Sequence, residues 1–328
     1  MAFVSRLDRM AVAAVVEQAP ELAQPRTELQ SYRAHGGNLS SESRAQLSAT
    51  KVSMVATGDQ ILVAAVWVLE TIAKAQTQYV EAFQACQQDR YYDAWQSFER
   101  AEIQLSYLGY HFDDPNDRYG VAFMLEHIPR FQLLFPYKVF ISPGFIKLEQ
   151  RCSICNHVVT PRKPCGHRVF ELYDGEMCGR IITQMKLLEI SVVEHPVQKY
   201  SVGFSSTPYN YGPVYCAVSR LRSAWDGWDI HTEMRRHKDP KFLLPPYAGC
   251  GRNAPCPCRS GKKYKHCCTG KSTYEVPHHV IHFKVPPPLG ASLSDEFPVR
   301  YSVNDPVPKA KAPRRNKFSV CGHPTSSP

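Results

Sequence analysis

Four cysteines lie within thirteen residues of this chain, in the order Cys256, Cys258, Cys267 and Cys268. A disulfide within either close pair would strain the short stretch of backbone that joins its two residues. One metal ion held by all four thiolates avoids this strain, since Pro257 stiffens the first pair and Ser260-Gly261 allow the chain to turn back. The spacing therefore predicts a structural zinc site, and it limits this segment to a small, tightly folded module.

The segment GRNAPCPCRSGKKYKHCC, residues 251–268, resembles the SEC-C motif, which was first recognised at the C-terminus of the SecA preprotein translocase ATPase. One departure is Arg259, where Gly is common; arginine would be strained there if the backbone needed a positive φ. The resemblance covers about 18 of 328 residues. It implies a zinc-stabilised module whose basic face binds an acidic chaperone or other anionic partner. Translocase activity is not implied, because the chain has no G-x4-GK[ST] phosphate loop.

Positive charge is concentrated in the C-terminal part of the chain. The net charge is +9, yet residues 235–328 hold 17 Lys+Arg and 5 Asp+Glu, whereas residues 1–234 hold 22 and 25. Lys262, Lys263, Lys265 and Arg259 surround the four cysteines, where they would stabilise thiolates and form a basic surface. This asymmetry predicts an acidic protein, nucleic acid or an anionic membrane face as partner, and a solvated basic tail is the alternative.

A second cluster contains five potential ligands: Cys152, Cys155, Cys165, His167 and Cys178. The C-x2-C pair lets two thiolates of one tight turn reach the same ion. Zinc has four ligand positions, so we expect Cys165 or His167 to be the spare residue. Buried free thiols or a redox pair are the alternatives. The stretch resembles a segment of uncharacterised bacterial and phage-related zinc-binding proteins, which implies metal binding but no activity. The prediction is two structural zinc ions per chain.

The overall pattern predicts an α+β fold with a helical N-terminal part. We expect a flexible or helical lead-in over 1–58, including a Ser/Gly-rich linker at 35–50, and a helical region over 59–112 that resembles one tetratricopeptide-type hairpin. A central α+β domain follows over 113–248, the SEC-C module over 249–270, a terminal strand within 271–285, and a disordered, Pro-rich basic tail over 286–328.

Within the central domain, the local patterns favour strands over 131–150 and 199–204. They favour a short helix over 180–189 and an amphipathic helix over 219–237. No apolar run approaches the ~20 residues that a membrane span needs, and the run at 10–16 lacks the features of a signal peptide. We therefore expect a cytoplasmic protein with reduced thiols.

Nothing in the sequence predicts a catalytic site, because no G-x-S-x-G, H-E-x-x-H or G-x-G-x-x-G pattern occurs. The segment HHVIH could hold a further metal through His278, His279 and His282, but a surface histidine cluster is the stronger interpretation. The leading hypothesis is a non-enzymatic interaction protein or adaptor that docks through Lys262, Lys263 and Lys265. The alternatives are a nucleic-acid-binding protein of the zinc-ribbon type and an enzyme whose site forms only in the folded central domain.

Overall fold

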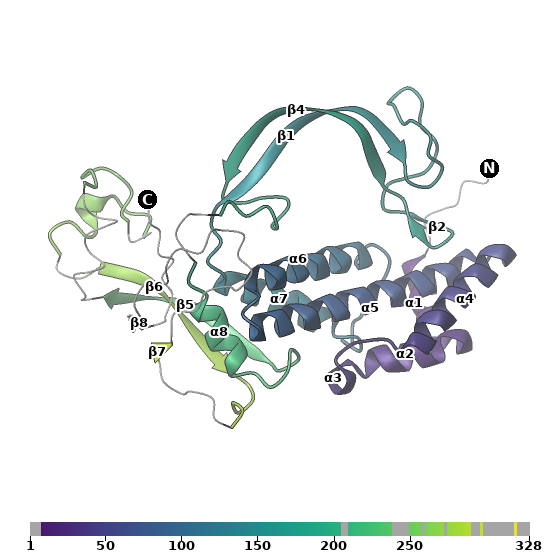
Figure 1. Cartoon of the computed structure of the whole chain (residues 1–328), viewed down its shortest axis with the longest axis horizontal. Helices are drawn as coiled ribbons and strands as arrows, with labels where there is room; N and C mark the ends of the chain where they lie inside the picture. The colour runs from purple at the N-terminus through teal and green to yellow at the C-terminus, as the bar shows by residue number, and fades with distance from the viewer. Residues whose placement is uncertain are drawn as a thin grey trace. The chain divides into compact units, whose positions relative to one another are not determined.

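The computed structural model describes residues 8–204, 209–237, 249–257, 260–271, 274–289, 296–297 and 318–319 (Figure 1). Helices and two-stranded antiparallel sheets make up this part of the chain, which confirms the α+β class. The chain divides into two compact units. The first contains residues 1–85, 92–129 and 137–204, and the second contains residues 86–91, 130–136 and 205–328.

The elements follow one another along the chain in this order: α1 (Arg9–Gln18), η1 (Pro20–Leu22), α2 (Ala23–Gln30), α3 (Tyr32–His35), α4 (Ser41–Thr57), α5 (Gln60–Gln87), α6 (Tyr91–Leu108), α7 (Val121–Leu134), β1 (Phe140–Cys152), β2 (Leu172–Tyr173), β3 (Glu176–Met177), β4 (Arg180–Val193), α8 (Gly212–Ser219), β5 (Trp228–His237), η3 (Tyr264–His266), β6 (Tyr274–Phe283), β7 (Glu296–Phe297) and β8 (Phe318–Ser319).

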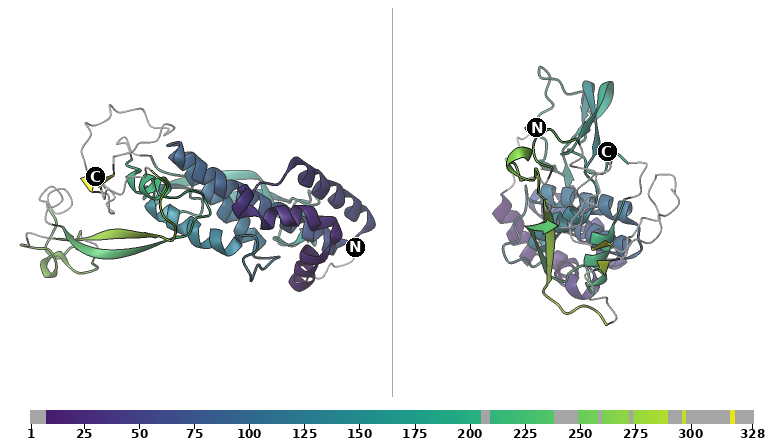
Figure 2. Two further views of the ribbon diagram at one scale, coloured as in Figure 1. Left: turned by 90° about the horizontal axis from the view of Figure 1, so that it is seen from below. Right: turned by 90° about the vertical axis from the view of Figure 1, so that its left-hand side faces the viewer.

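Helices α5 and α6 form the centre of the first unit, as the helical pattern over 59–108 predicts. Figures 1 and 2 show the helices of this unit packed side by side. Apolar residues at helical spacing are buried here, among them Val68, Leu69 and Ile72 of α5 and Trp95 and Phe98 of α6. The buried Gln76 side chain joins α5 to two neighbouring segments: its amide donates hydrogen bonds to the carbonyl oxygen of Leu29 in α2 at 3.0 Å and to that of Tyr119, just before α7, at 2.8 Å.

The predicted linker at 35–50 is wrong, because helix α4 begins at Ser41. Ser40 is its N-cap, and its hydroxyl accepts a hydrogen bond from the Ser43 backbone N–H. The Glu28 carboxylate accepts hydrogen bonds from both serines. Slight burial raises the pKa of Glu28, but these hydrogen bonds outweigh it and lower the pKa. Ser40 is therefore a helix cap, and the serines that follow it belong to the helix itself.

Strands β1 and β4 pair in antiparallel fashion from Phe140–Val193 to Cys152–Arg180, as a curved two-stranded ribbon (Figure 1). The helix predicted over 180–189 is wrong, because these residues pair with β1 instead. The strand predicted over 131–150 begins only at Phe140, since α7 extends to Leu134. Residues 199–204 form an isolated bridge, Phe140 to Val202.

The middle of the β1–β4 ribbon exposes apolar side chains. The partners Phe145 and Leu187 are 36% and 56% exposed. Ile190, Val192 and Met185 are 63–70% exposed on β4. The Phe140 end is held to the first unit's helices, where its ring stacks on Trp95 with centroids 6.1 Å apart. The ribbon is therefore anchored at this end and uncovered along its length.

In the second unit, β5 and β6 form another antiparallel ribbon, paired from Trp228–Phe283 to His237–Tyr274. The helix predicted over 219–237 is wrong: α8 ends at Ser219, and Trp228 begins a strand. The Trp228 side chain is fully buried, and its ring packs edge-on against Phe131 at 5.0 Å. The predicted strand within 271–285 is confirmed as β6.

The predicted disordered tail over 286–328 falls mostly outside the described residues. Of the described part, residues 286–289 have no regular structure, and β7 pairs with β8 through two residue pairs. No helix among the described residues is long and apolar enough to cross a membrane.

Gly175, in the turn between β2 and β3, is the glycine whose replacement the fold resists most clearly. Its φ is +73°, and a Cβ there would lie 2.8 Å from a Val63 methyl and 2.6 Å from Lys51 Cε. Gly36 has a similar φ of +75° with open space around it, so it is a matched control. We expect Gly36→Ala to lower the free energy of unfolding by about 1–2 kcal/mol through backbone strain. Gly175→Ala should cost about 1–3 kcal/mol more through overpacking, measured by urea unfolding. Equal losses would contradict this packing.

Candidate metal centres

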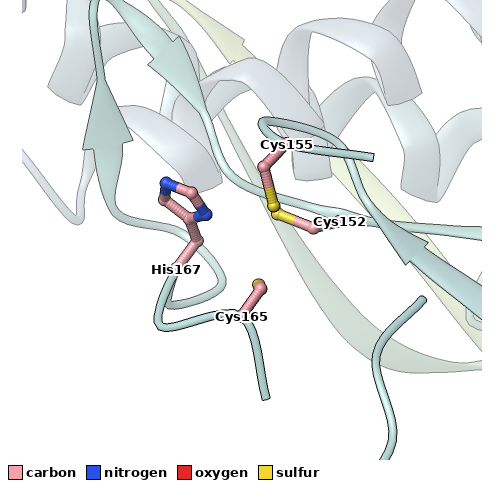
Figure 3. A group of neighbouring side chains, drawn as sticks. All are labelled: Cys152, Cys155, Cys165 and His167. Atoms are coloured by element: carbon pink, nitrogen blue, oxygen red, sulfur yellow. The ribbon is translucent and has the colours of Figure 1, made fainter. Parts of the chain in front are cut away.

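The first cysteine cluster closes the far end of the β1–β4 ribbon. Cys152 is the last residue of β1, and Cys178 stands two residues before β4. The ligand atoms of Cys152, Cys155, Cys165 and His167 all lie within 4.8 Å of one another. Figure 3 shows these four side chains gathered together, with the sulfur atoms of Cys152 and Cys155 side by side and Cys165 and His167 on the second loop. This group could hold one metal ion.

Two tight turns bring these ligands together. In the first, the Asn156 N–H donates to the Cys152 carbonyl at 2.9 Å, and the Cys152 N–H donates to the His157 carbonyl at 3.0 Å. Asn156 takes the positive φ of 56° that this turn requires. In the second, Gly166 has a φ of 86° between Cys165 and His167. Both turns resemble the short C-x-x-C and C-x-H geometries that aim two side chains at one ion.

Cys178 lies beside this group of four without joining it. The Cys178 side chain is fully buried, and its Sγ is 3.8 Å from the Cys152 Sγ. Two thiolate ligands of one tetrahedral zinc ion have their sulfur atoms at this separation, ~3.8 Å. The Arg180 guanidinium donates a hydrogen bond to the same Sγ at 3.3 Å. The sequence left Cys165 or His167 as the spare residue, whereas the structure brings both of them together and leaves Cys178 at the side.

His167 has an unusual environment for an imidazole. Its Nδ1 atom is buried and has no hydrogen-bond partner in the structure. Its ring packs edge-on against Tyr173 with centroids 4.6 Å apart. A buried polar atom without a partner costs free energy. A metal ion bound through Nδ1 would give this atom a partner and remove that cost. The donor set of three thiolates and one imidazole fits zinc.

The thiols of the cluster favour different protonation states. Burial raises the pKa of Cys152, but hydrogen bonds from the backbone N–H groups of Cys155 and Ile154 and from neighbouring thiols lower it to about 6. Burial and the adjacent Cys152 raise the pKa of Cys178. A hydrogen bond from the His157 backbone N–H lowers the pKa of Cys155, but the neighbouring Cys152 and Cys165 raise it, and the net shift is upward. Without a cation, one thiolate thus suppresses the ionisation of its neighbours, and a bound metal ion would remove that conflict.

The loop that carries these ligands is also attached to the helices of the first unit. Phe170, with a φ of 70°, stacks on Tyr110 at a centroid distance of 4.9 Å, and its carbonyl lies 2.7 Å from His111 Nε2. At the β2–β3 turn, the Gln60 amide donates to the Asp174 carboxylate at 2.7 Å and accepts from the Asp174 backbone N–H at 3.1 Å. The cluster is therefore held in place by packing as well as by its own turns.

The second cluster lies in the segment between β5 and β6. Cys256, Cys267 and Cys268 have their sulfur atoms within 4.8 Å of one another, and the Cys267–Cys268 separation is 3.7 Å. Cys256 and Cys268 are 3% and 6% exposed. Cys258, the fourth predicted ligand, and Arg259, the departure from the motif, lie outside the described residues. The three described cysteines form a second group that could hold a metal ion.

Backbone hydrogen bonds fold this module tightly. The Cys256 N–H donates to the Lys262 carbonyl at 2.8 Å, and Pro255 forms an isolated bridge with Lys263. Gly261 supplies the turn with a φ of 73°, and the short helix η3 then places Cys267 and Cys268 beside Cys256. The Ser260 hydroxyl lies 3.1 Å from the Cys267 Sγ, a contact that can stabilise a thiolate.

The described Lys and Arg residues of the module are exposed to solvent. Lys262, Lys263 and Lys265 are exposed, and so is Arg252. Two functional neighbours were not predicted from the sequence: Arg180, which contacts Cys178, and Ser260, which contacts Cys267. The signal for Arg180 is its position two residues after a cysteine ligand candidate, and the signal for Ser260 is its place in the turn between the cysteine pairs.

Comparison with known proteins identifies the motif of this module and two relatives of limited coverage. The model of the SEC-C motif matches residues 252–268. The protein translocase subunit SecA of Nitrosomonas eutropha is 30% identical over 111 residues, which is 33% of this chain and 11% of that protein. The SecA subunit of Treponema pallidum is 74% identical over 27 residues, which is 8% of this chain and 3% of that protein. The chain thus spans a small fraction of these relatives, and no solved structure matches it.

Metal content per chain tests whether the two groups are independent sites. We expect two zinc ions per chain, one for each cysteine-rich group. Cys155→Ser and Cys256→Ser should each lower the content to one, because each removes a thiolate from a different group. Elemental analysis after anaerobic purification measures this. Cys86→Ser, which replaces a buried cysteine outside both groups, is the control and should keep both ions. A wild-type value near zero would contradict both sites.

The identity of the fourth ligand in the first group can be measured separately. We expect His167→Ala to weaken metal binding strongly and Cys178→Ser to leave one ion in the site, because the four mutually close ligand atoms include His167 and not Cys178. Cobalt(II) substitution reports the ligand set, since the intensity of its thiolate charge-transfer band rises with the number of bound sulfurs. A band that falls in Cys178→Ser and persists in His167→Ala would assign Cys178 instead.

Proposed function

We propose that this protein is a non-enzymatic interaction protein that holds two structural zinc ions and docks on an acidic protein surface through its SEC-C module. The observation that carries the proposal is the module itself: residues 252–268 match the motif, and its three described lysines at 262, 263 and 265 are exposed around buried cysteines. The named relatives are subunits of protein translocase, and their function does not transfer to a chain that shares so little of their length.

The placement of the module supports a docking role. It lies between β5 and β6, which pair over ten residues each, so both of its ends join one ribbon. A segment connected at both ends to the same ribbon has less freedom of motion than a module on a single linker. Less orientational freedom is then lost on binding a partner.

Charge complementarity indicates the kind of partner. Four thiolates around zinc would carry a formal charge of −2, and the exposed Lys262, Lys263 and Lys265 together with Arg252 outnumber it. The module would therefore present a net positive surface, which favours and steers an acidic partner. A closed cysteine site also leaves no open position for a reacting water, which favours a structural role for the metal over a hydrolytic one.

The first unit offers a second reason to favour interaction over catalysis. The β1–β4 ribbon exposes Phe145, Leu187, Leu188 and Ile190, each at least 36% exposed. Exposed apolar patches of this kind are typical of surfaces that contact other proteins. The proposed protein would present an apolar ribbon and a basic module to its partners.

Charge neutralisation of the module tests the proposal. The variant Lys262→Gln/Lys263→Gln/Lys265→Gln should bind an acidic probe, polyglutamate, about 3- to 100-fold more weakly than the wild type, because exposed charge pairs contribute about 0.2–1 kcal/mol each. Fluorescence anisotropy at low and moderate salt measures the affinity. The control is Lys147→Gln/Lys186→Gln, which removes exposed lysines from the β1–β4 ribbon and should leave the affinity unchanged.

Zinc content must be equal in all three proteins, so that a lost site is not mistaken for a lost contact. Equal affinity of the triple variant and the wild type would overturn the proposed docking face. A gel shift with single- and double-stranded nucleic acid tests the alternative partner. Strong binding that falls steeply with salt and disappears in the triple variant would replace the acidic protein by nucleic acid.

A further inference from the structure

Two histidines meet on one face of the β5–β6 ribbon, away from both cysteine groups. His282 Nε2 lies 3.3 Å from His231 Nδ1, and the planes of the two rings are nearly parallel, at 12° with centroids 5.1 Å apart. His231 comes from β5 and His282 from β6, 51 residues later in the chain. The pairing of the two strands thus brings together side chains that no local sequence pattern connects.

The strand register explains why these two rings face each other. His231 is opposite Val280, and His282 is opposite Asp229. Opposite residues share a face, and alternate residues along a strand do so too. His231 and His282 are therefore diagonal neighbours on the same face, at a spacing that long side chains can bridge. Both side chains are exposed, so an ion in solution can reach them.

The separation of the two nitrogens fits a metal ion. Zinc–imidazole bonds of about 2.0–2.1 Å place two nitrogens of a tetrahedral site about 3.3–3.4 Å apart. The observed distance between His282 Nε2 and His231 Nδ1 is 3.3 Å. We propose that His231 and His282 form a third metal site, which takes a borderline transition-metal ion such as Zn²⁺ or Ni²⁺, the class that imidazole prefers.

This site differs in kind from the cysteine groups. Among the described residues, no third histidine, cysteine or carboxylate lies close enough to complete a compact group with this pair. Two imidazoles leave further coordination positions to water or to a ligand from outside the chain. The ion is therefore exchangeable, and it binds more weakly than an ion held by four protein ligands. Because it joins β5 to β6, it holds the ribbon that carries the SEC-C module in register.

The geometry also corrects the set of residues that the HHVIH segment suggested. His279 lies on the other face of the ribbon, where its Nδ1 is 2.7 Å from the Thr232 hydroxyl. His278 shares the face of His282 but stands four residues away on the same strand, a Cα separation of about 13 Å. Neither can bind the same ion as His282 together with His231. The partner that the sequence could not reveal is His231.

Nickel titration of the zinc-loaded, untagged full chain tests the site. Isothermal titration calorimetry with Ni²⁺ alone, in a buffer that does not chelate metals, should detect one bound ion per chain. His231→Ala and His282→Ala should each weaken this binding by about tenfold or more, since even the loss of a residue that only supports a metal ligand costs that much. His279→Ala is the matched control on the opposite face and should bind as the wild type does.

Hydrogen exchange supplies a second measurement. Ni²⁺ should slow amide exchange of β5 and β6 in the wild type and in His279→Ala, but not in the two ligand variants. Zinc content should be unchanged in all of them, which shows that the exposed substitutions leave the cysteine sites intact. Equal nickel binding by His231→Ala and the wild type, or equal losses in all three variants, would overturn the site and leave the contact as a hydrogen bond between two imidazoles.

Discussion

A two-stranded ribbon has a single ladder of interstrand hydrogen bonds, and both of its faces can remain exposed to solvent. Its stability is therefore marginal unless its ends are held by other contacts. The β1–β4 ribbon is long, and the middle of the ribbon exposes apolar side chains that would normally be buried. One end is held by Phe140 on Trp95. The other end is closed by the convergence of Cys152 with Cys155, Cys165 and His167. The register of the ribbon and the position of its exposed face both depend on that convergence.

The second unit repeats this construction with different parts. Trp228 is buried at one end of the β5–β6 ribbon, and the SEC-C segment joins the strands at the other. In both units a cysteine-rich segment lies between two antiparallel strands, although the overall ligand pattern differs between the two segments. A small metal-binding segment can connect the two strands of a ribbon whatever the internal fold of the segment. The only requirement is that the two ends of the segment lie as far apart as two paired strands. The SEC-C module is thus integrated into the second unit, whereas the sequence suggested a separate segment followed by a terminal strand.

The sequence predicted the features that depend on residues close together in the chain, and it was misleading for features that depend on distant partners. Cysteine spacing identified both groups, because ligands from one turn must be close in sequence. The patterns at 180–189 and 219–237 suggested helices, yet both segments contribute to strands whose partners lie dozens of residues away. Ser40 was assigned to a linker although it caps helix α4 through the Ser43 N–H, and the Glu28 carboxylate that holds its hydroxyl belongs to another helix. Local periodicity contains no information about such distant partners, and the same limit concealed the contact of His231 with His282.

In the proposed function, metal binding and docking would be coupled through the lysines of the SEC-C module. The Cys256 N–H donates to the Lys262 carbonyl, and Pro255 bridges to Lys263, so the backbone that positions the lysines is the backbone that folds around the cysteines. Without a cation, several thiolates cannot ionise side by side, and the turn loses the interaction that closes it. The lysines would then keep their charge but lose their arrangement. An acidic partner that depends on that arrangement would distinguish the metal-bound module from a flexible basic segment of the same composition.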